Sequence, residues 1–148
     1  MTEHFDWIDM MEHMQEIRLF AGHHIRGKRE GATSPQEVDM LSRIYLAEEP
    51  LKPLQLSELM GLSKSAVSRL IDNLERNGFL AREYSQQDKR SYRLHLTEQG
   101  SQELQQAYRH YLEPIYRLRR TLGEERFHTL LSQIREANHL LQNTAADK

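Results

Sequence analysis

The chain has 148 residues, enough for one domain with a core that buries roughly two-thirds of the surface its unfolded form exposes. It contains no cysteine, which excludes disulfides, thiolate metal sites, iron–sulfur clusters and cysteine nucleophiles. The formal net charge of −2 is unevenly distributed, because residues 61–95 hold seven basic and four acidic side chains, a local charge of +3 that leaves −5 for the rest.

The first third of the chain predicts two helices. From about residue 5 to residue 25, apolar residues recur every three or four positions, which indicates a long amphipathic helix. A stretch with mixed charge and two glycines follows, and it is expected to form a loop. Residues 34–37 read Ser-Pro-Gln-Glu, a capping box with proline at the first helical position. A second helix is therefore predicted to begin at Pro35 and to end near Glu48, before two prolines.

The middle of the chain predicts two short helices and a β-hairpin. Residues 54–61 form the first helix, and residues 64–77 form the second, with Ser63 as its N-cap. Two short helices with a glycine at their junction are typical of a helix-turn-helix. Two β-prone runs, residues 79–84 and 92–96, then flank a polar stretch and predict the hairpin.

The last third of the chain predicts two further helices. Thr97 can cap a helix whose apolar residues follow a heptad pattern from position 104 to position 122. Pro114 lies inside this stripe and is expected to kink the helix, because proline removes a backbone hydrogen bond. Gly123 interrupts the pattern before a final helix. The tail from Asn143 is expected to lie outside that helix.

These elements predict a mainly α fold with a small β-hairpin wing. The winged helix-turn-helix occupies residues 34–97, and residues 1–33 and 98–148 form a helical dimerisation region. The apolar stripes of the flanking helices exceed what one small core can cover, which favours a homodimer; an intramolecular bundle is the alternative. A two-fold dimer would place two recognition helices about 34 Å apart, on successive major grooves of a pseudo-palindromic site.

The second helix of the helix-turn-helix is expected to present one face to DNA. Its inner face carries Val67, Leu70 and Leu74, so polar side chains lie on the outside. Arg69 has the fork geometry that pairs with O6 and N7 of a guanine, while serines at the helix start suit phosphate oxygens. Asp72 would repel phosphates. We expect an ion pair with the residue four positions later, Arg76, and the alternative is a contact with a cytosine amino group.

Four segments of the chain resemble the MarR family of transcriptional regulators. The last two match the wing motif and the start of the helix after the wing, and aspartate-x-arginine in the wing is the most specific element. Ser57 stands where the family usually has alanine, but a small residue there still permits close helix packing. The resemblance covers residues 34–100 well and the flanking helices only by length and pattern. The segments are Leu56–Leu70, Leu74–Leu80, Asp88–Ser91 and Leu94–Gly100.

The resemblance implies that Arg90 lies at the wing tip and enters the minor groove, with Asp88 holding it there. A guanidinium suits the negative potential of a narrow, A·T-rich minor groove. The alternative is that residues 85–91 are only a polar turn. The expected DNA-binding residues are Ser63, Lys64, Ser65, Ser68 and Arg69 on the recognition helix, and Asp88, Lys89 and Arg90 in the wing.

The resemblance also implies a sequence-specific regulator of double-stranded DNA, most often a repressor, that responds to a small aromatic effector. Five side chains are candidates for an effector crevice, but each also fits the role of an ordinary core residue, so no ligand residue is assigned. A zinc-responsive regulator of the same fold and a winged-helix protein-interaction module are the alternatives. The five candidates are Phe20, His24, Tyr45, Tyr108 and Tyr111.

Other classes of function find little support in the sequence. No nucleophile elbow, zincin motif or phosphate-binding glycine loop is present, so the chain is not expected to be an enzyme or to bind a cofactor. The pairs Asp9/His13 and Glu124/His128 could each supply two metal ligands, but neither reaches three, so no metal site is expected. Apolar runs are far shorter than the ~20 residues that span a bilayer, and no signal peptide is apparent, so a cytoplasmic location is expected.

Overall fold

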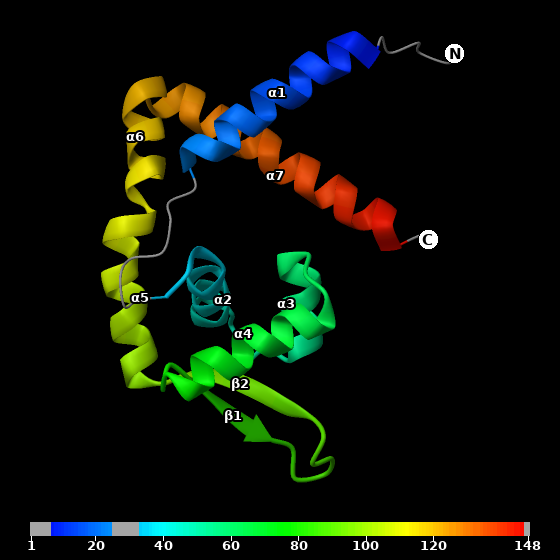
Figure 1. Ribbon diagram of the computed structural model, residues 1–148, viewed down its shortest axis with the longest axis vertical. Helices are drawn as coiled ribbons and strands as arrows, with labels where there is room; N and C mark the ends of the chain where they lie inside the picture. Colours follow the sequence, from blue (N-terminus) through cyan, green and yellow to red (C-terminus); the bar gives the residue numbers. More distant parts are fainter. Residues whose placement is uncertain (1–6, 25–32, 147–148) are drawn as a thin grey trace. The chain divides into compact units, whose positions relative to one another are not determined.

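The computed structural model describes residues 7–24 and 33–146. These residues form two compact units, residues 33–111 and residues 7–24 with 112–146. In chain order the elements are α1 (Trp7–His24), α2 (Pro35–Leu46), α3 (Pro53–Met60), α4 (Lys64–Arg76), β1 (Leu80–Tyr84), β2 (Tyr92–Leu96), α5 (Glu98–Tyr111), α6 (Glu113–Leu122) and α7 (Glu124–Ala146) (Figure 1). The prediction of a mainly α fold with one β-hairpin is confirmed.

Helix α2 begins with the predicted capping box. The Ser34 hydroxyl accepts a hydrogen bond from the Glu37 N–H at 3.2 Å, and Oε1 of Glu37 accepts one from the Ser34 N–H at 3.4 Å. Pro35 follows the cap and leaves no amide without a partner. The buried face of α2 then contributes Met40 and Leu41 to the core of the first unit. That core is completed by Val38, Ile44, Leu56, Val67, Ile71, Leu74, Leu80, Leu94, Leu104 and Ala107.

The hairpin has the predicted strands and a third, unpredicted partner. β1 and β2 pair antiparallel, with Leu80 opposite Leu96 and Tyr84 opposite Tyr92. On the other edge of β2, the Leu94 N–H donates to the Leu51 carbonyl at 2.9 Å, and these residues form an isolated bridge. The segment before α3 therefore ties the base of the wing to the helix-turn-helix.

Helix α5 is locked to the end of α4 by a threonine and a glycine. The Thr97 hydroxyl accepts a hydrogen bond from the Gly100 N–H at 3.0 Å and donates one to the Gly78 carbonyl at 2.5 Å. A Cβ atom at Gly100 would lie 2.1 Å from the Phe79 carbonyl oxygen. The helix can approach this backbone so closely only because residue 100 has no side chain.

The helix after the wing is broken rather than kinked, which corrects the prediction of one helix through Pro114. α5 ends at Tyr111, and α6 begins at Glu113 with Pro114 in its first turn, where proline costs no hydrogen bond. The heptad stripe is thereby divided. Leu104 and Ala107 are buried in the unit of residues 33–111, which extends beyond the predicted boundary at residue 97, while the later part of the stripe lies on α6.

The second unit consists of α1, α6 and α7, and much of its apolar surface is uncovered. α6 packs on α7, and α1 contacts α6, but no side chain of α1 is buried. α7 continues through Ala146, so the expected end of the helix near Asn143 was wrong. The large apolar side chains exposed on this unit include Trp7, Ile8, Met10, Met14, Ile17, Leu19, Leu140 and Leu141.

Candidate nucleic-acid interface

The helix-turn-helix is closed by Gly61 and by a serine on α3. Gly61 has φ +64°, a left-handed conformation that side chains rarely adopt, and it ends α3. The Leu62 N–H donates to the Ser57 carbonyl at 3.2 Å, and the Ser57 hydroxyl donates back to the Leu62 carbonyl at 2.6 Å. Ser57, which the sequence marked only as a small residue, thus fixes the turn that sets the angle of α4.

Helix α4 divides into a buried and an exposed face. Val67, Ile71 and Leu74 are buried, and Leu70, predicted to be on the inner face, is only half-buried. The start of the helix is capped as predicted, because the Ser63 hydroxyl accepts from the Ala66 N–H at 3.2 Å. The five residues predicted to face DNA, Ser63, Lys64, Ser65, Ser68 and Arg69, are all exposed.

The wing tip is shaped by two side chains that bind backbone amides. The Ser85 hydroxyl accepts from the Gln87 N–H at 3.2 Å, and Oδ1 of Asp88 accepts from the Arg90 N–H at 3.0 Å. The Ser91 N–H donates to the Asp88 carbonyl at 3.0 Å and closes the turn. Asp88 therefore holds the backbone of Arg90, not its guanidinium. All three predicted wing residues, Asp88, Lys89 and Arg90, are exposed.

The cations of this surface are available to an anionic partner. Among residues 7–24 and 33–146, no carboxylate forms an ion pair with Lys64, Arg69, Lys89 or Arg90. The structure records no contact between the two groups of residues, so α4 and the wing tip offer two separate basic points on one compact unit. Such a pair of points suits a polyanion that can be contacted in two places.

Arg82 joins the wing to α4 and is a residue that the sequence analysis did not single out. From β1 it forms ion pairs with Asp72, and with Glu75 at 3.1 Å, both on α4. Its guanidinium also lies 4.7 Å from the ring centre of Tyr92 on β2. Asp72 is thus paired with Arg82 and not with Arg76, as predicted.

The pKa values of this cluster reflect burial and charge. Burial alone would lower the pKa of Arg82, but the acidic groups of Tyr92, Asp72 and Glu75 raise it above its ordinary value. Burial raises the pKa of Tyr92, although the Arg82 charge acts in the opposite direction. At neutral pH the arginine is therefore charged and the phenol is neutral, so Arg82 compensates the negative charge on this side of α4.

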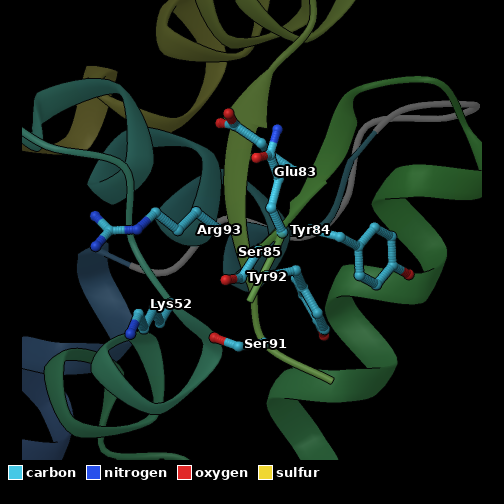
Figure 2. A pocket seen from close by; sticks show the side chains of 8 residues that line it. Lys52, Glu83, Tyr84, Ser85, Ser91, Tyr92 and Arg93 are labelled. Carbon is cyan, nitrogen blue, oxygen red and sulfur yellow. The ribbon is translucent and has the colours of Figure 1, made fainter. Parts of the chain in front are cut away.

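A hollow of about 370 Å³ lies beside the wing (Figure 2). Tyr84 and Arg93 point to opposite sides of the hairpin, as their alternation along the strands requires. Nη1 of Arg93 donates to the Pro50 carbonyl at 3.3 Å. The residues that line the hollow are Lys52, Glu83, Tyr84, Ser85, Gln86, Ser91, Tyr92 and Arg93.

The aromatic effector candidates include residues with structural roles. The Tyr111 hydroxyl donates to the Thr33 carbonyl, and burial together with Tyr45 raises the pKa of Tyr108. The Phe20 and His24 rings lie 4.5 Å apart on α1. None of these contacts identifies a ligand site.

The histidine pairs provide at most two ligands each. His128 forms an ion pair with Glu124 at 3.2 Å, and Glu124 is also bonded to Arg119. Within the described ranges, no three His, Asp or Glu side chains are grouped so that they could hold a metal ion. None of the helices in that part of the chain has the length and hydrophobicity to span a bilayer.

Residues 33–92, which contain α2, α3, α4 and most of the hairpin, match the family model of the MarR family. Over these residues the chain belongs to the MarR family. Among known proteins, it is 39% identical over 97 residues to an uncharacterized HTH-type transcriptional regulator, YkoM of Bacillus subtilis (strain 168). It is 32% identical over 103 residues to the HTH-type transcriptional repressor YetL of the same strain. These matches cover 66% and 69% of this chain, but only 59% and 56% of the relatives' lengths.

A solved MarR-type structure shares the fold. Streptococcus pneumoniae FabT, crystallised in complex with DNA, has a TM-score of 0.65 and 23% identity, with 94% of this chain and 99% of FabT covered. The resemblance drawn from the recognition helix and the wing motif is thus confirmed. The related proteins are named as transcriptional regulators, in agreement with the expectation that this MarR-family chain is not an enzyme.

Proposed function

We propose that this chain is a DNA-binding transcriptional regulator. The observation that carries the proposal is the pair of exposed, unpaired basic points, Arg69 on α4 and Arg90 on the wing, on one winged helix-turn-helix unit of the described chain. α4 enters the major groove, where Arg69 reads a guanine, and Ser65 and Ser68 bind phosphate oxygens. The wing places Arg90 in the neighbouring minor groove, and Lys64 and Lys89 add contacts with the backbone.

The Arg90→Ala variant tests this assignment. Each cation that contacts DNA displaces counterions, so its loss reduces the slope of log affinity against log salt by about one. We expect weaker binding and a flatter slope, with an unchanged circular dichroism spectrum. Arg109→Ala is the matched control, because Arg109 is an exposed arginine on α5 of the same unit. Equal affinity and slope for wild type and Arg90→Ala would contradict the assignment.

We also propose that the protein acts as a homodimer through its terminal helices. The support is the uncovered apolar surface of α1, where Trp7 and Ile17 are each 68% exposed, and of α7, where Leu141 is 68% exposed. A monomeric chain rarely leaves so much apolar surface in contact with water. Two copies would bind the half-sites of a pseudo-palindrome. Sedimentation equilibrium at micromolar concentration tests this, and a monomer would contradict it.

Repression released by a small aromatic effector is the mode of regulation that we propose. One relative, YetL, is named a repressor. An effector can act only through different affinities for the states that do and do not bind DNA. The experiment is a mobility-shift assay on the DNA upstream of the protein's own gene, repeated with a panel of aromatic acids. Shifts that no acid in the panel changes would contradict this proposal, without affecting DNA binding itself.

A further inference from the structure

The space between α4 and the wing has a defined role if the chain binds DNA as proposed, and the inference below depends on that function. A recognition helix in the major groove and a wing in the neighbouring minor groove straddle the sugar–phosphate strand that separates the two grooves. Side chains that are exposed between α4 and the wing therefore meet phosphates and sugars, not base edges.

The inner face of β1 leads from the core into this space. Leu80 is buried, Arg82 is half-buried against α4, and Tyr84, next on the same face, has 55% of its surface exposed. Figure 2 shows the Tyr84 ring on the side of the hairpin opposite Arg93. Its ring centre lies 5.5 Å from that of Tyr92, which limits the positions that the ring can adopt.

The charge around Tyr84 permits the approach of a phosphate. Asp72 and Glu75 on α4 would repel one, but Arg82 pairs with both and compensates their charge. Within the described part of the chain, the Tyr84 hydroxyl forms no hydrogen bond with another residue. A phenol is a good donor to a phosphate oxygen, and one that is already held in place loses little entropy on binding.

We propose that the Tyr84 hydroxyl donates a hydrogen bond to a phosphate oxygen of the DNA strand that passes between the recognition helix and the wing. The contact is with the phosphodiester backbone, so it positions the duplex and carries no sequence information. It also carries no charge. A neutral donor strengthens binding without displacing counterions, and this separates Tyr84 from Arg90 in its effect on salt dependence.

The Tyr84→Phe variant tests the proposal, because it removes the hydroxyl and keeps the ring. Affinity is measured by fluorescence anisotropy with a labelled random-sequence duplex at several low salt concentrations. We expect roughly a three- to tenfold loss at every salt concentration, the effect of one hydrogen bond, with an unchanged salt slope. Tyr116→Phe is the control, since Tyr116 is an exposed tyrosine on α6 in the other unit, and it should bind as wild type does.

Two results would overturn the contact. Affinity of Tyr84→Phe equal to that of wild type would exclude the hydrogen bond, and a flatter salt slope would show that the variant disturbs a neighbouring cation instead. A wild-type chain that binds neither this duplex nor its own upstream DNA would refute the proposed function, and the inference with it. Loss in Tyr84→Phe alone supports the contact, while loss in Arg90→Ala reports on the wing assignment separately.

Discussion

Replacement of Arg82 by methionine tests whether one side chain couples the wing to the recognition helix. Methionine keeps an apolar stem of similar length but removes the charge. Asp72 and Glu75 would then stand on α4 without their partner. Because the Arg82 side chain is only 17% exposed, the loss is expected to be larger than for an ion pair in open solvent.

The cost can be estimated from the contacts. Asp72 and Glu75 are 53% and 43% exposed, so each ion pair contributes at most about 1 kcal/mol. The contact with the Tyr92 ring adds about 0.5–1 kcal/mol. We therefore expect Arg82→Met to lower the free energy of unfolding by roughly 1–3 kcal/mol, which a domain with about 5–15 kcal/mol of stability tolerates.

Urea unfolding followed by circular dichroism measures this loss. Arg120→Met is the matched control, because Arg120 forms a single ion pair with Glu113 at 2.7 Å and both side chains are largely exposed. The control is expected to lose less than about 1 kcal/mol. The double variant Asp72→Asn, Arg82→Met should cost less than the sum of the two single changes. Equal losses for Arg82→Met and Arg120→Met would refute the role of Arg82 as a coupling residue.

Three further changes test local features. Gly100→Ala should destabilise the fold by about 3 kcal/mol, because its Cβ would clash with the Phe79 carbonyl, whereas Gly22→Ala, in open space on α1, should be neutral or stabilising in urea unfolding. Ser63→Ala should cost about 1 kcal/mol through the lost N-cap of α4; no measurable loss would contradict that role. The hydrogen bond with Arg119 lowers the pKa of Glu124, so this carboxylate stabilises the fold above its unfolded-state pKa, and the contribution disappears as the pH falls through the lower folded-state pKa. Glu124→Gln should therefore be less stable than wild type at neutral pH and equal to it near pH ~2; a difference that persists in acid would contradict this.

The features that the sequence predicted are those encoded by neighbouring residues. The capping box at Ser34, the N-cap at Ser63 and the left-handed Gly61 each depend on residues within a few positions, so local pattern was sufficient. The hairpin strands were also predicted within one residue. These local features placed the exposed residues of α4 and the wing tip correctly on the surface.

The features that the sequence missed depend on contacts between distant residues. Leu51 bonds to Leu94 across 43 positions, and Arg82 reaches Asp72 from another element, so neither is visible as a periodic pattern. The pairing of Asp72 with Arg76 was a reasonable helix rule, but a half-buried arginine on β1 competed successfully for the carboxylate. Pro114 breaks the helix because the chain gains a fresh start at Glu113, a choice that the heptad pattern concealed.

The contacts around Arg82 and Leu51 bear on how an effector could release DNA. β1 is joined to α4 by two ion pairs, and β2 is joined to the segment before α3 by a backbone hydrogen bond. The recognition helix and the wing thus behave as one preorganised body, and a ligand that changed their spacing would have to break these contacts. A change in the distance between two copies of this unit needs no such loss. We therefore expect an effector to weaken binding to a two-half-site operator far more than binding to a single half-site, and equal weakening of both would contradict this view.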